Sequence, residues 1–117
     1  GTAFLCCDEA GMPEAYRRFL LKKKYKETRM TSIFSGRRAR GISNLFIELM
    51  ENKKTVRFPA QNPMTAGIRR GVESIGDGKY ISLRAGSSFE RVRAFSVLKL
   101  MQEIDKELSS LVEKLTN

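Results

Sequence analysis

Residues 34–42 of this chain read FSGRRARGI, and residues 43–50 continue as SNLFIELM. Gly36 and Gly41 bracket three arginines, and glycine is the residue that best tolerates a left-handed backbone or the close approach of another segment. The apolar side chains that follow recur at steps of three and four, the spacing of one buried helical face. They are Ile42, Leu45, Phe46, Leu49 and Met50. We therefore predict a tight basic turn that leads into a helix.

The arginines of this turn are Arg37, Arg38 and Arg40. A helix N-terminus surrounded by arginines can hold an anion, because its unpaired N–H groups and its dipole both favour negative charge. The alternative is that these side chains cover an acidic surface or lie in solvent, which is the commoner role of a charge run. Both interpretations stay open at this point.

Size and composition indicate a soluble globular protein. The chain has 117 residues, with 41% hydrophobic and 30% charged residues, which is one domain's length or less and is not typical of disorder. No apolar run approaches the roughly 18 residues of a membrane span. The apolar start lacks the basic segment and length of a signal peptide. The chain does not begin with Met, so it need not start where its gene starts.

The net charge of +9 makes nucleic acid a candidate partner. However, the cations are scattered along the chain, and the sequence contains no zinc-ligand pattern, RNP motif or Trp that would recognise bases. The basic charge therefore permits nucleic-acid binding without indicating it.

Cys6 and Cys7 are the only cysteines, and the chain has no His. A disulfide between neighbouring residues is strained and rare, so we expect a reduced pair in a cytoplasmic protein. Without His, the chain lacks the commonest general base and every Ser-His or Cys-His arrangement. A zinc site built from this chain alone would need an unusual ligand set.

Apolar spacing, proline and glycine predict the remaining elements. We expect a buried strand over residues 3–7 and extended segments over 25–34, 55–59 and 80–83. We expect helices from Pro13 to Lys24, up to Met50, and from Asn62 to Ile75. A long amphipathic helix over 97–115 follows.

Three of these expectations concern helix ends and faces. Asn62 is a plausible N-cap with Pro63 at the first helical position, and the buried face of that helix would comprise Met64, Ile68, Val72 and Ile75. Gly67 and Gly71 lie one turn apart on that helix and would allow close packing, or would merely weaken it. Ser87 and Ser96 compete as the N-cap before the long helix.

The predicted strand at residues 3–7 indicates that the chain is part of a larger protein. The buried strand at residues 3–7 has no partner strands nearby in sequence to pair its backbone groups. We therefore interpret the chain as the end of a larger α/β protein.

Four motifs in the same order resemble those of the nitronate monooxygenase (2-nitropropane dioxygenase) family. GTAFL at 1–5, followed by DEA at 8–10, is similar to the family's G-T-x-F-L…D/E-A stretch. FSGRRARGI at 34–42 resembles F-S-G-R-P-A-R-G-I, PAQNPMT at 59–65 resembles P-x-Q-N-x-L/M-T, and SLRAG at 82–86 resembles S-L-W-A-G-Q. The resemblance extends more loosely to flavin-dependent enoyl-ACP reductases, which remain an alternative.

The resemblance implies an FMN enzyme on a (β/α)8 barrel, with this chain as its C-terminal third. Residues 1–24 would be the last barrel strand and its helix, 25–90 an accessory segment covering the active-site mouth, and 91–117 a helix returning to the barrel. Gly1 and Thr2 would contact the FMN phosphate through backbone N–H groups, and Gly86 would contribute at its turn. The flavoenzyme interpretation rests on Gly1–Leu5 being that strand.

The resemblance also places part of the chemistry elsewhere. The family's catalytic His, its glycine-rich flavin loop and its other phosphate-binding glycines would lie upstream, so we assign no catalytic residue to this chain. The sequence departs from the family's motifs at three positions: Arg84 replaces the family's Trp and Ser87 its Gln, on either side of the turn at Gly86, and Arg38 replaces its Pro. The arginines of the basic turn could assist an anionic substrate, or they could form salt links between the accessory segment and the barrel.

The intact protein would oxidise an alkyl nitronate with O₂ through the flavin, without a membrane, and could form a homo-oligomer. Two other classes stay open. One is a small basic helical module that binds nucleic acid through phosphate contacts, and the other is a structural fragment that associates through its long C-terminal helix.

Overall fold

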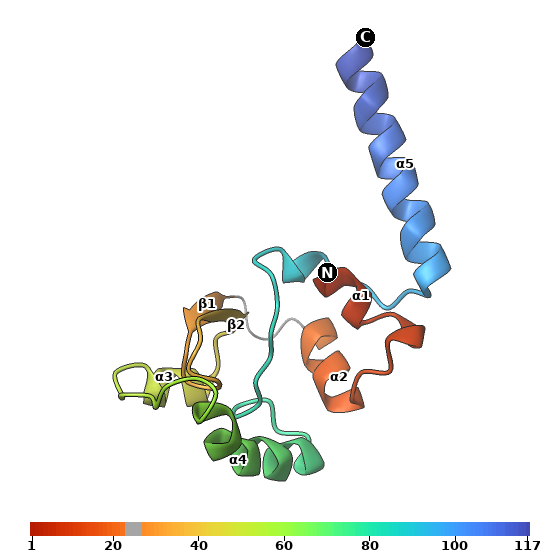
Figure 1. The fold of residues 1–117 in the computed structure, drawn as a ribbon. Helices are drawn as coiled ribbons and strands as arrows, with labels where there is room; N and C mark the ends of the chain where they lie inside the picture. The colour runs from red at the N-terminus through yellow and green to blue at the C-terminus, as the bar shows by residue number, and fades with distance from the viewer. Residues whose placement is uncertain (23–26) are drawn as a thin grey trace.

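The structure is a computed structural model that describes residues 1–22 and 27–117. Figure 1 shows a body of short elements from which one long helix, α5 (Val97–Thr116), projects. One side of the body contains α1 (Thr2–Leu5), a 3₁₀ turn η1 (Asp8–Ala10) and α2 (Glu14–Lys22). The other side contains β1 (Thr28–Thr31), β2 (Ala39–Ile42), α3 (Leu45–Met50) and α4 (Gln61–Ile75). The fold is mixed α/β.

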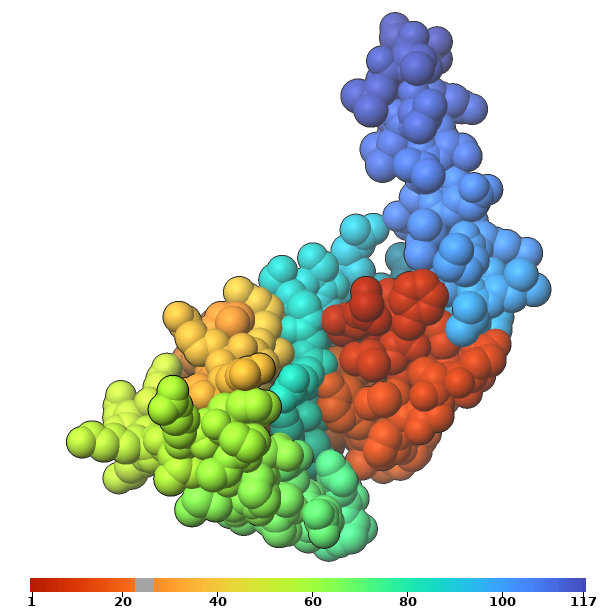
Figure 2. Space-filling view, in the orientation of Figure 1, coloured from red at the N-terminus to blue at the C-terminus, as the bar shows by residue number. Residues whose placement is uncertain are grey.

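The segment after α4 joins the two sides. Residues 80–92, which include the 3₁₀ turn η2 (Phe89–Arg91), run between them in the space-filling view (Figure 2). On one side, the Ile42 N–H donates to the Leu83 carbonyl over 2.7 Å. On the other, the Tyr16 hydroxyl donates to the Arg84 carbonyl. The segment is therefore held by hydrogen bonds from both directions.

A small antiparallel sheet underlies this connection. β1 and β2 pair in a register that sets Met30 opposite Arg40. Gly41 of β2 also forms an antiparallel bridge with Arg84 on its other side. β2 is thus the middle of three extended segments, and side chains of adjacent residues along it point to opposite faces.

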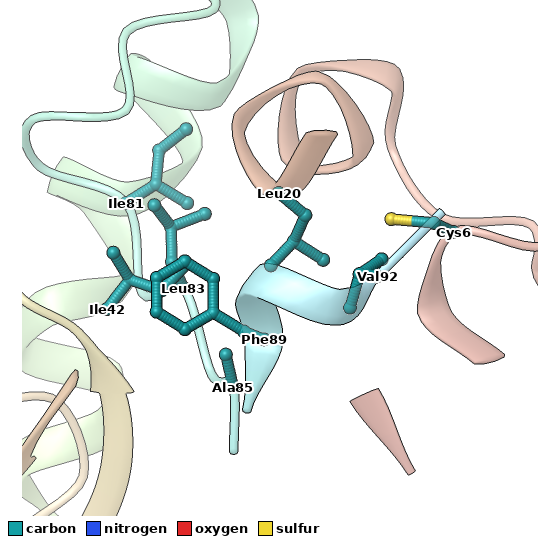
Figure 3. Close-up of a cluster of buried hydrophobic side chains, with 8 residues drawn as sticks. All are labelled: Cys6, Leu20, Ile42, Ile81, Leu83, Ala85, Phe89 and Val92. Atoms are coloured by element: carbon teal, nitrogen blue, oxygen red, sulfur yellow. The ribbon is translucent and has the colours of Figure 1, made fainter. Parts of the chain in front are cut away.

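Two clusters of buried apolar side chains form the core. The larger cluster joins both sides of the body through residues that lie far apart in sequence, as Figure 3 shows. It contains Cys6, Leu20, Ile42, Ile81, Leu83, Ala85, Phe89 and Val92. The smaller cluster lies between the 31–36 region and α3, and contains Ile33, Phe34, Phe46 and Ile47. The rings of Phe34 and Phe46 are 5.1 Å apart between centroids, a favourable tilted contact.

The strand predicted over residues 3–7 is wrong, because Thr2–Leu5 form the short helix α1. The Phe4 N–H donates to the Gly1 carbonyl, and the Cys7 N–H donates to the Phe4 carbonyl, each over 3.1 Å. Buried backbone groups must be paired, and a helical turn pairs them locally where the described residues supply no adjacent strand. The burial of Cys6 and Cys7 agrees with the apolar character of the run, and both are free thiols.

The basic turn is present, but it leads into β2 and not directly into a helix. Gly36 has φ +86, and a Cβ there would lie 2.7 Å from the Phe58 backbone nitrogen, so the turn requires glycine. The helix α3 starts only at Leu45, after Asn44, whose side-chain oxygen accepts a hydrogen bond from the Ile47 N–H. Ile42 therefore belongs to the sheet and not to the helical face.

Helix α4 confirms the predicted element but not its details. It begins at Gln61, with Ala60 rather than Asn62 as the N-cap, and it ends at Gly76, which has a left-handed φ of 69. Of the four residues predicted as its buried face, Val72 is half-buried and packs against the larger core cluster, whereas Met64, Ile68 and Ile75 are exposed. Gln61 and Thr65 are buried instead. These two polar side chains donate to the carbonyls of Ile33 and Phe34. A Cβ at Gly67 or Gly71 would meet nothing within 4 Å, so the close packing predicted there is absent from the described structure.

The other predicted helices are confirmed. α2 follows Pro13 as expected, although Lys23 and Lys24, at its predicted end, lie outside the described residues. Ser96 and not Ser87 caps α5, since its hydroxyl accepts from the Lys99 N–H over 3.2 Å. The extended segment predicted over 25–34 is confirmed in part as β1, and residues 25 and 26 of that segment lie outside the described residues.

The projecting helix makes the molecule elongated, with extents of 53 × 28 × 25 Å. The radius of gyration is 16.7 Å, whereas a compact domain of this length has about 13 Å. Along α5, seven large apolar side chains are between 42% and 86% exposed: Leu98, Met101, Ile104, Leu108, Leu111, Val112 and Leu115. In the described part of the chain, no helix has both the length and the apolar character needed to cross a membrane.

Candidate functional site

The largest described cavity lies where α1, the 86–95 segment and the first turns of α5 meet. Its volume is about 440 Å³, which is within the range of small-molecule sites. The residues that line it are Gly1, Thr2, Ala3, Gly86, Ser87, Ser88, Phe89, Arg91, Val92, Arg93, Phe95, Leu100, Glu103, Ile104 and Glu107.

The three residues singled out in the sequence for cofactor binding come together in this cavity. Gly1, Thr2 and Gly86 all line it, and the Gly86 N–H donates to the Thr2 hydroxyl oxygen over 2.8 Å, across 84 positions of sequence. A Cβ on Gly86 would lie 3.4 Å from that hydroxyl oxygen, whereas one on Gly1 would meet nothing within 4 Å. The backbone at Gly1 is therefore open to the close approach of a ligand.

Some of the charged side chains that line the cavity form salt bridges and others do not. Arg91 pairs with Glu107 over 3.3 Å, and Lys99 pairs with Glu103 over 2.9 Å. The hydrogen bond from Lys99 lowers the pKa of the Glu103 carboxyl, so this group stays ionised. Arg93 forms no salt bridge with a described carboxylate, although its charge also helps to lower the pKa of Glu103, and its guanidinium lies 6.0 Å from the centre of the Phe95 ring. The Arg93 guanidinium therefore keeps N–H groups available for an anion in the cavity.

The opposite wall is apolar. Phe89 and Val92 belong to the larger core cluster and are buried, and Phe95, Leu100 and Ile104 also line the cavity. The site thus combines hydroxyl, amide and guanidinium donors on one side with a hydrophobic surface on the other. This arrangement suits an amphipathic ligand with an anionic end.

Two buried features support the site without entering it. Tyr16 is half-buried, its hydroxyl donates to the Arg84 carbonyl two residues before Gly86, and burial raises its pKa to about 12. Burial also raises the pKa of the Cys6 and Cys7 thiols. These cysteines therefore remain protonated and pack in the core as apolar groups.

The structure separates the basic turn from the cavity. Arg37, Arg38 and Arg40 are not among the cavity-lining residues, and the arginines do not surround a helix N-terminus. The Arg37 guanidinium instead lies 3.9 Å from the centre of the Phe58 ring, a cation–π contact. Arg84 does not line the cavity, whereas Ser87 does. The sequence analysis predicted no role for Arg91 or Arg93, although the R-V-R spacing after Glu90 places two cations at the end of η2 and just after it.

The comparisons with known proteins agree with the motifs quoted from the sequence. The nitronate monooxygenase family model matches residues 1–107. The chain belongs to the nitronate monooxygenase family. The predicted family is therefore confirmed. The match includes residues 2–5, which form α1 and not a strand. The condition set from the sequence, that the flavoenzyme interpretation requires a strand at Gly1–Leu5, is therefore not met, whereas membership of the family does not depend on it.

Curated relatives of this nitronate monooxygenase family member are longer than it is. A probable nitronate monooxygenase from Staphylococcus saprophyticus subsp. saprophyticus is 29% identical over 116 residues, which is 97% of this chain and 33% of the relative. One from Staphylococcus haemolyticus is 32% identical over 114 residues, with 96% and 32% covered. The chain thus spans about one third of the length of these curated relatives.

A solved structure agrees with these matches. The nitroalkane oxidase from Streptomyces ansochromogenes, studied by crystallography and site-directed mutagenesis, superimposes with a TM-score of 0.92 at 30% sequence identity. The match covers 98% of this chain and 33% of the oxidase. The mixed α/β fold of this chain is therefore the fold of one third of that enzyme's chain.

Proposed function

We propose that this chain is the C-terminal third of an FMN-dependent nitronate monooxygenase built on a (β/α)8 barrel, and that its cavity holds the FMN phosphate. The observation that supports this most directly is that Gly1, Thr2 and Gly86 line one cavity, although Gly86 is distant in sequence from the other two. Family membership supports a small-molecule oxidoreductase.

The cavity residues fit a phosphate group. A phosphate needs amide and hydroxyl donors together with a cation. The Gly86 N–H already donates to the Thr2 oxygen, so the Thr2 hydroxyl hydrogen is available to donate to a ligand. The open backbone at Gly1 admits an oxygen atom at close range, and Arg93 supplies positive charge. The carboxylates of Glu103 and Glu107 are each paired with a cation, which limits their repulsion of an anion.

The side chains present indicate which roles belong to FMN, to this chain and to the rest of the protein. FMN, when bound, supplies the electron acceptor for nitronate oxidation and the centre that reacts with O₂. This chain contains no His, so we place the residue that abstracts the substrate's proton in another part of the protein. The residues of this chain orient the phosphate end of the cofactor, and residues 25–90 cover the mouth of the active site.

The exposed face of α5 supports a larger assembly. Its apolar side chains Met101, Ile104, Leu108, Leu111 and Leu115 recur at alternating steps of three and four. Burying such a stripe stabilises a protein by about 25 cal/mol per Å² of apolar surface, so a stripe of this size is favourable to cover. We propose that the barrel formed by the rest of the enzyme covers it.

The test compares FMN with riboflavin, which lacks the phosphate. The protein is produced from its complete reading frame, and the affinity for each flavin is measured by fluorescence quenching for wild type, Thr2→Val, Arg93→Gln and the control Arg70→Gln. Arg70 is exposed on α4, away from the cavity. Losing a hydrogen bond to a charged group costs about 1.5–3 kcal/mol, so Thr2→Val should lower FMN affinity about 10- to 100-fold and leave riboflavin affinity unchanged.

Equal loss of affinity for both flavins would contradict phosphate anchoring at this cavity. Failure of the wild-type protein to bind either flavin would contradict the flavoenzyme assignment itself. Turnover of an alkyl nitronate with O₂ consumption distinguishes the favoured activity from the enoyl-ACP reductase alternative, which would instead reduce an enoyl thioester.

A further inference from the structure

A second, much smaller recess lies on the sheet, away from the flavin-phosphate cavity. It is lined by Thr31, Phe34, Ser35, Arg37, Ala39, Arg40, Gly41, Ser82, Leu83 and Arg84. We propose that this recess is a binding site for a small-molecule oxyanion, a carboxylate or phosphate group held between Arg37 and Arg84. The proposal does not rest on the flavin assignment.

The register of the three extended segments decides which groups face the recess. Gly41 bridges to Arg84, so Arg84 and Gly41 lie on the same face of the sheet, and the neighbouring Arg40 points to the other face. The Arg40 guanidinium donates to the Thr28 hydroxyl on that other face over 3.1 Å. Arg40 therefore lines the recess with its backbone, and the guanidinium groups of Arg37 and Arg84 are the charges available there.

The recess is uniformly cationic. None of its lining residues is acidic, and neither Arg37 nor Arg84 forms an ion pair with a described residue. Arg29, which shares the face of Gly41 and Arg84, is paired with Glu51 over 2.7 Å. The half-buried Ser82 hydroxyl forms no hydrogen bond with another described residue, so it is available as a donor beside the two guanidinium groups. Two guanidinium groups without ion-pair partners and one available hydroxyl form a set of hydrogen-bond donors that matches an oxyanion.

The Arg37 side chain and the backbone of Arg84 are held in place before any ligand arrives. The Ser35 hydroxyl accepts from the Arg37 N–H and contacts its carbonyl, each over 3.3 Å, and the Arg37 guanidinium stacks on Phe58. The backbone of Arg84 is held by the Tyr16 hydroxyl and by the bridge to Gly41. Stacking uses the face of a guanidinium and leaves its N–H edge free. Ordering that precedes binding lowers its entropic cost.

The size of the recess limits the ligand. Its volume of about 10 Å³ is close to the minimum that admits one water molecule. One oxygen of a carboxylate or phosphate can enter while the rest of the molecule stays at the mouth. A Cβ at Gly41 would lie 3.1 Å from the Leu83 carbonyl oxygen, so glycine keeps the two segments close at this point.

The test uses the protein from its complete reading frame, loaded with whatever cofactor it carries. Inorganic phosphate and acetate are titrated separately by calorimetry at constant ionic strength, with chloride as the balancing anion. The variants are Arg84→Gln and Arg37→Gln, and the matched control is Arg70→Gln, which removes the same charge from an exposed position on α4. Arg93→Gln reports on anions that bind in the larger cavity.

We expect saturable binding of one of the two anions, weakened about 10-fold or more by Arg84→Gln and by Arg37→Gln, and changed less than about 2-fold by Arg70→Gln. The anion with the tighter binding identifies the ligand group. Absence of saturable binding, or an equal loss in Arg70→Gln, would overturn the site. Loss in Arg93→Gln alone would assign the anion to the larger cavity and overturn the proposal, while leaving the flavin assignment intact.

Discussion

Replacing Asn44 should strongly destabilise the protein, because its side chain makes three hydrogen bonds in a buried position. Its oxygen accepts from the Ile47 N–H over 3.1 Å and caps α3. Its amide group donates to the carbonyls of Gly78 and Ile81 over 3.1 and 2.7 Å. The residue is 1% exposed, so water cannot replace these partners.

The expected cost follows from those three bonds. Removing an N-cap side chain costs about 1 kcal/mol, and leaving a buried carbonyl without its donor costs about 1–3 kcal/mol. Asn44→Ala should therefore lower the free energy of unfolding by roughly 3–5 kcal/mol, a large part of the 5–15 kcal/mol typical of a domain. The measurement is urea unfolding followed by circular dichroism, with the slope checked for two-state behaviour.

Two further variants separate the contributions. Asn44→Ser keeps a good capping oxygen but no amide donors, so it should be about 1 kcal/mol more stable than Asn44→Ala. Asn44→Asp also keeps the cap, but it places carboxylate oxygens against two carbonyls, so it should be no more stable than Asn44→Ser. If Asn44→Ala costs less than about 1 kcal/mol, or if Asn44→Asp is close to wild type, then the amide does not fix residues 78–81 through these hydrogen bonds.

Four other substitutions test three separate features. Gly36→Ala should cost more than about 2 kcal/mol, because φ is +86 and the new Cβ would lie 2.7 Å from a backbone nitrogen. Gly71→Ala, in open space on α4, should instead stabilise the protein by about 0.5–1 kcal/mol. Equal effects of the two substitutions in thermal melts would refute the turn geometry. Burial raises the pKa of Tyr16 to about 12 from 10.0, so the neutral phenol favours the folded state. This contribution to stability is fully present below pH 10 and is lost as the pH rises through about 12. Melting temperatures across that range should show the loss in wild type and not in Tyr16→Phe. Ser96→Ala should cost about 1 kcal/mol by removing the α5 cap, and hydrogen exchange at Lys99 should rise, whereas unchanged exchange would show that the cap is not formed in solution.

Elements with strong local signals could be predicted from the sequence. Pro13 before α2, Gly76 after α4 and Ser96 before α5 are each recognised from a residue type at a helix end. The cap Asn44 was missed because Ile42 fits the helical spacing of Leu45 and Phe46 as well as it fits a strand. What assigns Ile42 to β2 is a hydrogen bond from its N–H to Leu83, which no local pattern contains.

Apolar periodicity also failed on α4, for a different reason. The helix packs through Gln61 and Thr65, whose side chains reach the carbonyls of Ile33 and Phe34. Its apolar residues Met64 and Ile75 stay exposed. A polar side chain that hydrogen-bonds to a buried carbonyl does not contribute to a hydrophobic pattern. The packed face of α4 could therefore not be predicted from the spacing of its apolar residues.

The candidate site was only partly visible in the sequence. Gly1, Thr2 and Gly86 were proposed from motifs that resemble a family, and the structure brings them together at one cavity. The contribution of Arg93 depends on its position in space next to residues far away in sequence. The opening strand failed because a strand needs partners, and among the described residues a single helical turn pairs the same backbone groups.

The position of α5 couples solubility to assembly. The helix is long, its apolar stripe is exposed, and the core of the body is complete before it begins. Stripes of this kind associate with one another when their concentration rises. A cell that makes this chain in excess of whatever covers α5 should accumulate it as aggregates, so the yield of soluble material would report directly on how well that helix finds its cover.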